Sequence, residues 1–567
     1  MKRTALGLRA HFALPPILLL VALAAQAAGG APDVVLFNGK VFTADPAHPR
    51  ATALAIRGER LVAVGSDAAV KRLADAHTRL LDLGRRTVIP GLNDAHAHLA
   101  VWPKDQVNVE TETMDPDWPQ LRDALRKAAA GAPPGALLSG SFGTRIFHDP
   151  AIDRAALDAV VADHPVMLVD FDGHAAILNS AELRALQIGD DIADPLGGRF
   201  ERDAAGHLDG VMREYAAWAV MGRRASAAVS DADASSALQS QLQQAAAWGV
   251  TTIQDMPIDM PVDRFVRLAS ALPPCVRLRV TRMNATTAIG PEFGEGDPKP
   301  AHPTPLVSVD GTKWVLDGVI FEGGFTPRRE AAARAAAPAG PYSFAGLPPL
   351  FEPAVVEAML RDSLQHDYQL QLHVFGRPAA LELFAALEKT GGLPVWAHRR
   401  LRIEHGDGLT PELIAKAKSY GLIVSQQGTH FGIAEIDPSL DAGFLPRLRA
   451  FKAQPLRSLV AAGVPIALGS DGVLNPWLGV LGATTHQDRP TEAITVAQAV
   501  TAATRGSAWA EFTERDKGML APGKLADLAV LSQDVFAVPP SELANTTSLL
   551  TLVGGRVVHD TPTLRLP

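Results

Sequence analysis

The chain has very little cysteine, since Cys275 is the only one among 567 residues. A single thiol excludes an intramolecular disulfide framework and any metal site made only of cysteine. Positive charge is not in excess either: 53 Lys and Arg stand against 61 Asp and Glu, a formal net charge of −8. This balance gives no support for nucleic acid as a partner. Metal chemistry would therefore have to use His, Asp, Glu or Lys.

Long apolar runs are also missing, because no uncharged stretch of membrane-spanning length follows the N-terminal segment. That segment has a positive start at residues 2–9 and an apolar stretch from Ala13 to Ala25 that Pro15-Pro16 interrupts. Ala25-Gln26-Ala27 then offers the small residues that signal peptidase requires. We expect a signal peptide at residues 1–27, a periplasmic or secreted protein and no stable membrane span. An uncleaved membrane anchor is the alternative.

What remains is an ordinary globular composition, 47% hydrophobic and 20% charged. From residue 87 to residue 517, apolar β runs alternate with Ala-rich helical stretches, the pattern of a parallel α/β fold. We expect helices at Asp231–Trp248 with Ser230 as N-cap, from about Pro353 to His366, and beyond Thr410-Pro411. A (β/α)8 TIM barrel is predicted, with candidate strands Thr87–Leu92, Val250–Asp255, Arg277–Thr281, Thr312–Leu316, Gln369–Val374, Leu401–Glu404, Leu422–Gln426 and Pro465–Gly469.

The regions outside this pattern suggest further units. The gap after the first strand is too long for one crossover, so an insertion at about residues 101–229, with a helix at Gln120–Ala130, is expected to cover the barrel mouth. Short β runs at both chain ends, residues 28–86 and 518–567, predict two halves of one small β-sandwich domain. Asn38-Gly39 predicts a hairpin between its flanking strands, and Gly554-Gly555 predicts another turn.

Candidate chemical groups stand where the predicted strands end. In a (β/α)8 barrel, reactive groups project from the C-terminal ends of the strands. His96 and His98 are two residues apart in an extended segment, so both imidazoles point to one face and can hold one ion. His373 alone would more often be a hydrogen-bonded core histidine. Five of the eight strand ends, however, carry a potential ligand or base, which predicts a metal site made of His96, His98, Lys313, His373, His405 and Asp471.

These motifs resemble the amidohydrolase superfamily of metal-dependent hydrolases, and among its branches family 3, which includes N-substituted formamide deformylases. The resemblance covers nearly the whole chain after the signal segment. It is carried by FNGKVFTAD, VIPGLNDAHAH, DGHAAILNS, GTKWVLDG, HVFG, RIEHG, LGSDG and GMLAPGKLADLAVL. It implies hydrolysis of amide-type, non-peptide C–N bonds in a small-molecule substrate, with zinc as the expected ion, one or two per chain.

The resemblance also implies residue roles. His96 and His98 would bind the more buried ion, and His373 and His405 the more exposed one. Lys313 would bridge both as a carbamate (N6-carboxylysine), because an ammonium group has no free lone pair. Asp471 would contact the metal, take a proton from the attacking water and pass it to the leaving nitrogen. A plain Lys313 beside a single ion is the alternative, with Asp317 or Glu322 as substitute carboxylates.

Three further residues are candidate substrate contacts: His174 in DGHAAILNS, His430 in VSQQGTH and Arg145 in GSFGTR. The alternative for His174 is a structural hydrogen bond, and the alternative for His430 is a surface position. The alternative for Arg145 is a salt bridge between the insertion and the barrel. Glu404 is expected to brace the barrel by pairing with Arg402 rather than to act in catalysis.

Two positions near the expected pocket depart from the family. Gly376-Arg377-Pro378 stands where an acidic residue is common, and Gly428 stands where proline is common. The substrate therefore stays open. A deaminase or cyclic-amide hydrolase on the same site, and a periplasmic binding protein on a dead barrel, are the rival functions. A homo-oligomer is compatible with the sequence.

Overall fold

The computed structural model describes residues 30–143, 145–293, 301–318, 348–431, 454–472, 475–486 and 489–564. The predicted signal peptide, residues 1–27, and Glu322 lie outside the described residues. Within these ranges, no helix has both the length and the apolar character needed to cross a bilayer.

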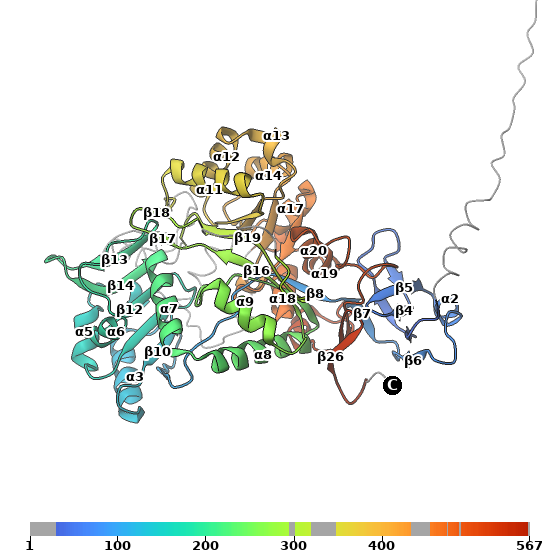
Figure 1. Ribbon diagram of the computed structural model, residues 1–567, viewed down its shortest axis with the longest axis horizontal. Coiled ribbons are helices and arrows are strands. Elements are labelled where there is room, and N and C mark those ends of the chain that lie inside the picture. Colours follow the sequence, from blue (N-terminus) through green and yellow to red (C-terminus); the bar gives the residue numbers. More distant parts are fainter. Residues whose placement is uncertain are drawn as a thin grey trace, which may run out of the picture.

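Eight parallel strands form a nearly closed barrel at the centre of the molecule (Figure 1). Neighbouring strands pair in sequence order, and the seam closes where the backbone N–H groups of Ser470 and Asp471 donate to the carbonyl oxygen of His96 at 3.1 and 2.9 Å. The predicted mixed α/β barrel is therefore confirmed. Its strands are β8 (Leu92–Ala97), β15 (Val250–Asp255), β16 (Arg277–Met283), β19 (Val307–Val315), β20 (Leu370–Val374), β21 (Arg402–His405), β22 (Ile423–Gln426) and β23 (Ile466–Leu468).

The prediction of Thr87–Leu92 as the first barrel strand is wrong. β7 (Thr87–Pro90) belongs to another sheet, and the barrel strand starts at Leu92. The change of sheet takes two residues: the Gly91 N–H donates to Asp527 O, and the Leu92 N–H donates to Gly249 O. A Cβ on Gly91 would overlap the side chain of Thr251. Both strands are fully buried, so hydrophobicity alone could not separate them.

Helices line the outside of the barrel and share one apolar core with its strands. Three begin as the sequence predicts: Ser230 accepts from the Asp233 N–H at the start of α8 (Asp231–Ala247), α11 covers Pro353–His366, and α14 (Pro411–Ser419) has Thr410 as N-cap. The others described between consecutive barrel strands include α9 (Val262–Ala271), α12 (Arg377–Lys389), α13 (Gly392–Trp396) and α17 (Leu456–Ala462).

A six-stranded sheet lies in the chain between β8 and β15, to one side of the barrel (Figure 1). The Tyr215 hydroxyl accepts a 2.9 Å hydrogen bond from the Val315 N–H, which ties this unit to β19. The predicted helix at Gln120–Ala130 is part of α3. In sheet order the strands are β13 (Gly198–Arg202), β14 (Leu208–Glu214), β12 (Ala175–Leu178), β11 (Val166–Asp170), β10 (Leu138–Phe142) and β9 (Val107–Asn108), with α3 (Trp118–Gly131), α4 (Arg145–His148), α5 (Arg154–Val160), α6 (Ser180–Ala185) and α7 (Tyr215–Ala228).

Both chain ends contribute to two sheets on the opposite side of the barrel (Figure 1). Apolar side chains from both sheets, such as Leu36 and Leu528, meet in one cluster. One sheet has the order β5 (Arg60–Gly65), β4 (Ala53–Arg57), β1 (Val34–Phe37), β6 (Arg79–Asp82); the other has the order β26 (Arg556–Asp560), β25 (Ser548–Val553), β24 (Leu528–Leu531), β7, β2 (Lys40–Phe42), β3 (Arg50–Ala51).

The two turns predicted in these sheets have different outcomes. Gly554-Gly555, with φ of 53° and 71°, joins the antiparallel pair β25 and β26 as predicted. The hairpin at Asn38-Gly39 is wrong, because β1 pairs with β4 and β6 whereas β2 pairs with β3 and β7. Asn38, at φ 56°, carries the chain from one sheet to the other.

Candidate metal centre

The two histidines at the end of β8 have fixed ring orientations. His96 Nδ1 is 2.7 Å from Glu404 Oε2, and His98 Nδ1 is 2.7 Å from the carbonyl oxygen of Met256. Both acceptors hold the proton on Nδ1 and leave the Nε2 lone pair free. The two Nε2 atoms face each other at 3.3 Å. Two lone pairs so close need a proton or a cation between them.

Asp471 completes a triangle with this pair. Its Oδ1 lies 3.4 Å from His96 Nε2 and 3.3 Å from His98 Nε2, so the three donor atoms are nearly equidistant. Tetrahedral zinc with bonds of about 2.0–2.2 Å to nitrogen and oxygen places its ligand atoms about 3.3–3.6 Å apart. The side chains present therefore fit an ion of this kind.

The backbone holds Asp471 in a conformation that non-glycine residues rarely adopt, with φ at 50°. Burial raises the pKa of its carboxyl. Without a cation, a protonated His96 and the hydrogen bonds with His430, His96 and His98 outweigh burial and keep this pKa well below its usual range. The carboxyl is therefore ionised at neutral pH, as a metal ligand or a proton acceptor must be.

A second donor group shares the same carboxylate. His430, on the 3₁₀ turn η2 (Gly428–Phe431), places Nε2 3.3 Å from Asp471 Oδ2, and His405 Nδ1 lies 3.8 Å from that oxygen. Ligand atoms of His405, His430 and Asp471 all lie within 4.8 Å of one another, as do those of His96, His98 and Asp471. His430 therefore lies next to the predicted ligands rather than on a remote surface.

His373, on β20, packs against His405 with ring centroids 4.4 Å apart. Its Nε2 and the Nδ1 of His405 are buried and have no hydrogen-bond partner among the described residues. Burial lowers the pKa of both rings well below the usual range, so both are neutral at neutral pH. Neutral imidazoles whose buried nitrogens have no hydrogen-bond partner are suitable ligands for a cation.

Lys313 on β19 is buried, and its Nζ contacts Met256 Sδ at 3.5 Å. Burial lowers the pKa of this amine to about 8, although Glu404 and Asp471 attract its charge. Asp317, the substitute carboxylate, accepts hydrogen bonds from the N–H groups of Phe375 and Gly376 and lies 3.6 Å from His373 Nε2. Burial raises the pKa of Asp317 to about 7.

Glu404 contributes more than the sequence indicated. The expected pair with Arg402 is present at 2.9 Å, but the same carboxylate also holds Nδ1 of His96. The expectation that Glu404 only braces the barrel is therefore incomplete. Strand alternation would separate Glu404 from its neighbour His405; His405, however, has φ 69°, which breaks the alternation and lets both side chains reach the centre.

His174 and Arg145 occupy different positions relative to this centre. The His174 ring lies 5.4 Å from that of His373, and its Nδ1 is 2.7 Å from Glu214 Oε2. Burial lowers the pKa of His174, but the Glu214 charge outweighs it and raises the pKa to about 9. Arg145, at the start of α4, is exposed and lies 3.7 Å from Asp115, which belongs to the same part of the chain.

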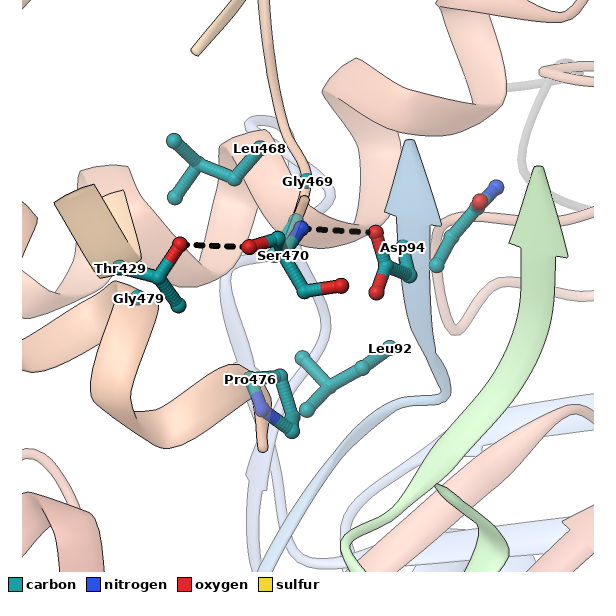
Figure 2. A pocket seen from close by; sticks show the side chains of 10 residues that line it. Leu92, Asp94, Thr429, Leu468, Gly469, Ser470, Pro476 and Gly479 are labelled. Carbon is teal, nitrogen blue, oxygen red and sulfur yellow. Dashed lines mark hydrogen bonds between the residues drawn. The ribbon is translucent and has the colours of Figure 1, made fainter. Parts of the chain in front are cut away.

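Two hydrogen bonds connect Ser470 with neighbouring elements at the barrel seam, as Figure 2 shows. The Ser470 N–H donates to Asp94 Oδ1 at 3.0 Å, and Thr429 Oγ1 donates to Ser470 O at 2.6 Å. None of the candidate histidines lines the small cavity there, whose walls are Leu92, Asn93, Asp94, Thr429, Leu468, Gly469, Ser470, Pro476, Gly479 and Ala503. This cavity is therefore separate from the candidate metal centre.

Comparison with known proteins identifies the family of this chain. The model of the amidohydrolase family matches residues 79–559. The chain belongs to the amidohydrolase family. The resemblance stated from the motifs is thereby confirmed, and this amidohydrolase is a hydrolase of carbon–nitrogen bonds. A non-catalytic binding protein does not fit that assignment.

Relatives of this amidohydrolase align over most of their length. It is 25% identical to Protein LONG AFTER FAR-RED 3 of Arabidopsis thaliana, over 94% of this chain and 92% of that protein. It is 26% identical to the N-substituted formamide deformylase of Arthrobacter pascens, over 92% and 97%. A solved uncharacterized metal-dependent hydrolase from Pyrococcus furiosus aligns with a TM-score of 0.61 at 18% identity, over 89% of this chain and 99% of that chain. The last likeness supports the fold.

Proposed function

We propose that this amidohydrolase cleaves an amide-type, non-peptide C–N bond of a small molecule with the help of one or two divalent ions, zinc foremost. The observation that carries the proposal is the triangle of His96 Nε2, His98 Nε2 and Asp471 Oδ1, with sides of 3.3 to 3.4 Å. The formamide deformylase among the relatives supports N-acyl amines as the first substrate class to examine.

His96, His98 and Asp471 would hold the first ion. His373, His405 and Lys313 are proposed for a second ion, Lys313 as N6-carboxylysine. The unpartnered nitrogens of His373 and His405 support this set. The lowered pKa of Lys313 supports it too, because carbon dioxide reacts with a free amine. When bound, such an ion acidifies a water molecule and polarises a carbonyl group.

The remaining chemistry belongs to the chain's own residues. Asp471 Oδ2 takes the proton of the attacking water and gives it to the leaving nitrogen, which would otherwise depart as a strongly basic amide anion. The Asp471 side chain is 19% exposed, so a substrate can reach it. His430 orients this carboxylate through its 3.3 Å contact with Oδ2. His174, which Glu214 fixes, and Arg145 are proposed to contact the substrate.

We further propose that the part of the chain from about residue 101 to residue 229 covers the barrel mouth. The position of His174, which reaches His373 from that part, supports this placement. The two terminal sheets, with their common apolar cluster, are proposed to form a β-sandwich.

A deaminase or cyclic-amide hydrolase with one ion is the second candidate. One contact of Lys313 favours this candidate. Its amine donates to Met256 Sδ, so it has a partner as an unmodified amine and needs no carbamate.

A panel of formamides, N-acyl amines, dipeptides, cyclic imides and aminated heterocycles tests the proposal. We expect turnover of the acyclic amides, loss of turnover with a chelator, and recovery with zinc or manganese. Asp471→Asn should keep its metal but lose about 10²- to 10⁴-fold in kcat, the usual contribution of a positioned proton carrier. A near-normal rate in Asp471→Asn would refute the assigned base, and turnover of only cyclic imides or aminated heterocycles would favour the second candidate.

A further inference from the structure

The two carboxylate oxygens of Asp471 face different imidazole pairs. Oδ1 lies 3.4 and 3.3 Å from the Nε2 atoms of His96 and His98. Oδ2 lies 3.3 Å from His430 Nε2 and 3.8 Å from His405 Nδ1. The first pair comes from the end of β8, and the second comes from the end of β21 and from η2. One side chain thus separates two donor groups.

We infer that His405, His430 and Oδ2 of Asp471 form a second cation position, in which His430 is a metal ligand. The inference rests on the proposed function, because it takes Oδ1 as a ligand of the first ion. It differs from the set of His373, His405 and carboxylated Lys313, since it needs no modification of the lysine.

The His405 side of this position is built into the barrel. The Nδ1 of His405 is buried and has no hydrogen-bond partner among the described residues. Asp471 Oδ2, at 3.8 Å, is too far away for a hydrogen bond. A buried polar atom without a partner is costly. His405 also has φ 69°, so strain is retained at the residue that presents this atom.

The His430 side is fixed just as firmly. Thr429 Oγ1 donates to Ser470 O, which ties η2 to the residue before Asp471 (Figure 2). A Cβ on Gly428 would overlap the carbonyl oxygen of Gly479, so η2 rests directly on α18 (Pro476–Thr485). The His430 ring stacks on that of His405 with an interplanar angle of 15° and centroids 5.7 Å apart. Two parallel rings and one carboxylate thus converge.

Two imidazoles and one carboxylate select borderline divalent ions such as zinc, cobalt or cadmium. The His430 side chain is 27% exposed, against 1% for His96, so the second ion would exchange more readily than the first. It would also occupy Oδ2, the atom proposed to accept the proton. Binding at the second position would therefore inhibit turnover when metal is in excess.

Titration of the metal-free, full-length enzyme with zinc tests the inference, with stoichiometry and Kd from calorimetry and metal analysis. We expect two equivalents in the wild type. His430→Ala should lose the second zinc ion or bind it more than about tenfold more weakly. Mutation of a residue that only contacts a ligand already costs about tenfold in metal affinity, so loss of a ligand should cost more. His366→Ala, a change at the end of α11, should keep both.

Cobalt and cysteine provide a spectroscopic check. In His430→Cys the second equivalent should return, and with cobalt it should show a thiolate-to-metal charge-transfer band that the wild type lacks. This readout separates loss of a ligand from loss of folding. Retention of the first equivalent in His430→Ala would show that the rest of the centre is intact.

The outcomes separate the two proposals. A second equivalent that persists unchanged in His430→Ala overturns the inference, and its loss in His373→Ala alone would assign it to the other set. A wild type that binds one ion also overturns the inference but leaves the proposed function standing. A wild type that binds none, and whose turnover ignores chelators, overturns both.

Discussion

At the residue scale, the candidate centre depends on a side chain that would not touch the metal. Glu404 has no exposed surface, receives two hydrogen bonds from Arg402 and accepts from His96 Nδ1. Such a carboxylate fixes the tautomer of the histidine and increases its basicity as a ligand. Burial raises the pKa of Glu404, but the charge of Arg402 and the contact with His96 outweigh it and hold the pKa far below its usual range. The carboxylate is therefore permanently ionised.

We predict that Glu404→Gln releases metal about 10- to 100-fold faster to a chelator, because His96 loses its ionic partner. The matched control is Glu511→Gln, which breaks another buried ion pair, with Lys517 at 2.8 Å. Both variants should lower the free energy of unfolding by about 3–5 kcal/mol, the usual cost of leaving one buried charge without its partner. Equal rates of metal release in the two variants would contradict the role of Glu404.

The strand-end positions of the candidate ligands were predictable, and the contacts that their neighbours make were not. Histidines two residues apart or at strand ends are visible in the sequence, because strand direction alone brings strand ends together. The positive φ of His405 is set by tertiary packing, so alternation wrongly separated it from Glu404. The proximity of His430 to Asp471 depends on a glycine contact between η2 and α18, which the sequence does not encode as a pattern.

At the element scale, the barrel closes through a contact that only glycine permits. A Cβ on Gly469, just after β23, would overlap the Cβ of His96 on β8. Gly469, two residues before Asp471, therefore packs directly against His96. We expect metal affinity and barrel closure to be linked at this point.

We predict that Gly469→Ala destabilises the fold by about 1–3 kcal/mol, as overpacking of a tight site does, and reduces bound zinc because His96 must move. Gly222→Ala on α7 is the control, since its Cβ would lie 3.6 Å from Ile258 O in ordinary contact. Alanine there should stabilise the helix by about 0.5–1 kcal/mol. Thermal melts and zinc content of both variants provide the measurement, and normal zinc content in Gly469→Ala would refute the link.

Elements with strong local signals were predictable to the residue, such as strand Val250–Asp255 and helix Pro353–His366. Two errors have a common cause. Asn38-Gly39 forms a turn but joins strands of different sheets, and β7 continues into β8 after Gly91 has changed sheets. The local sequence predicts where the chain bends. Which strands pair with each other depends on distant residues, such as those of β24, hundreds of positions away.

At the scale of the whole molecule, several buried carboxyl groups make stability depend on pH. Asp259 accepts a 2.6 Å hydrogen bond from the Val101 N–H, and burial raises its pKa to about 6. The folded state then holds a proton that the unfolded chain releases near pH 4. The resulting stabilisation is complete below about pH 4 and disappears as the pH rises through about 6.

We predict that the contribution of Asp259 to the stability of the metal-free protein falls by about 1 kcal/mol between about pH 5 and pH 7.5, and that Asp259→Asn removes this part of the pH dependence. Asparagine keeps an acceptor for the Val101 N–H, so the hydrogen bond survives. Urea unfolding at the two pH values measures the effect. Asp94 and Asp317, whose pKa values burial raises to about 6 and about 7, act in the same direction. His373 and His405, whose pKa values burial lowers, act in the opposite direction, so the variant is compared with the wild type and the slope is not interpreted alone. An unchanged slope in Asp259→Asn would contradict the assignment.

Export through residues 1–27 remains a proposal. In a Gram-negative host, the protein should appear in the periplasmic fraction and begin at Ala28 when its N-terminus is sequenced. Ala27→Arg should block cleavage and retain the protein at the membrane. Cytoplasmic accumulation of the uncleaved wild-type chain would contradict the proposal.

The pairing of β7 with β24 has a consequence for how the molecule is made. The residues that join there, such as Ile89 and Ala529, are hundreds of positions apart in the chain. The edge of β7 that pairs with β24 therefore stays unpaired until β24 has left the ribosome. An unpaired strand edge can pair with another chain and cause aggregation, so binding of a chaperone at β7 would protect the nascent enzyme.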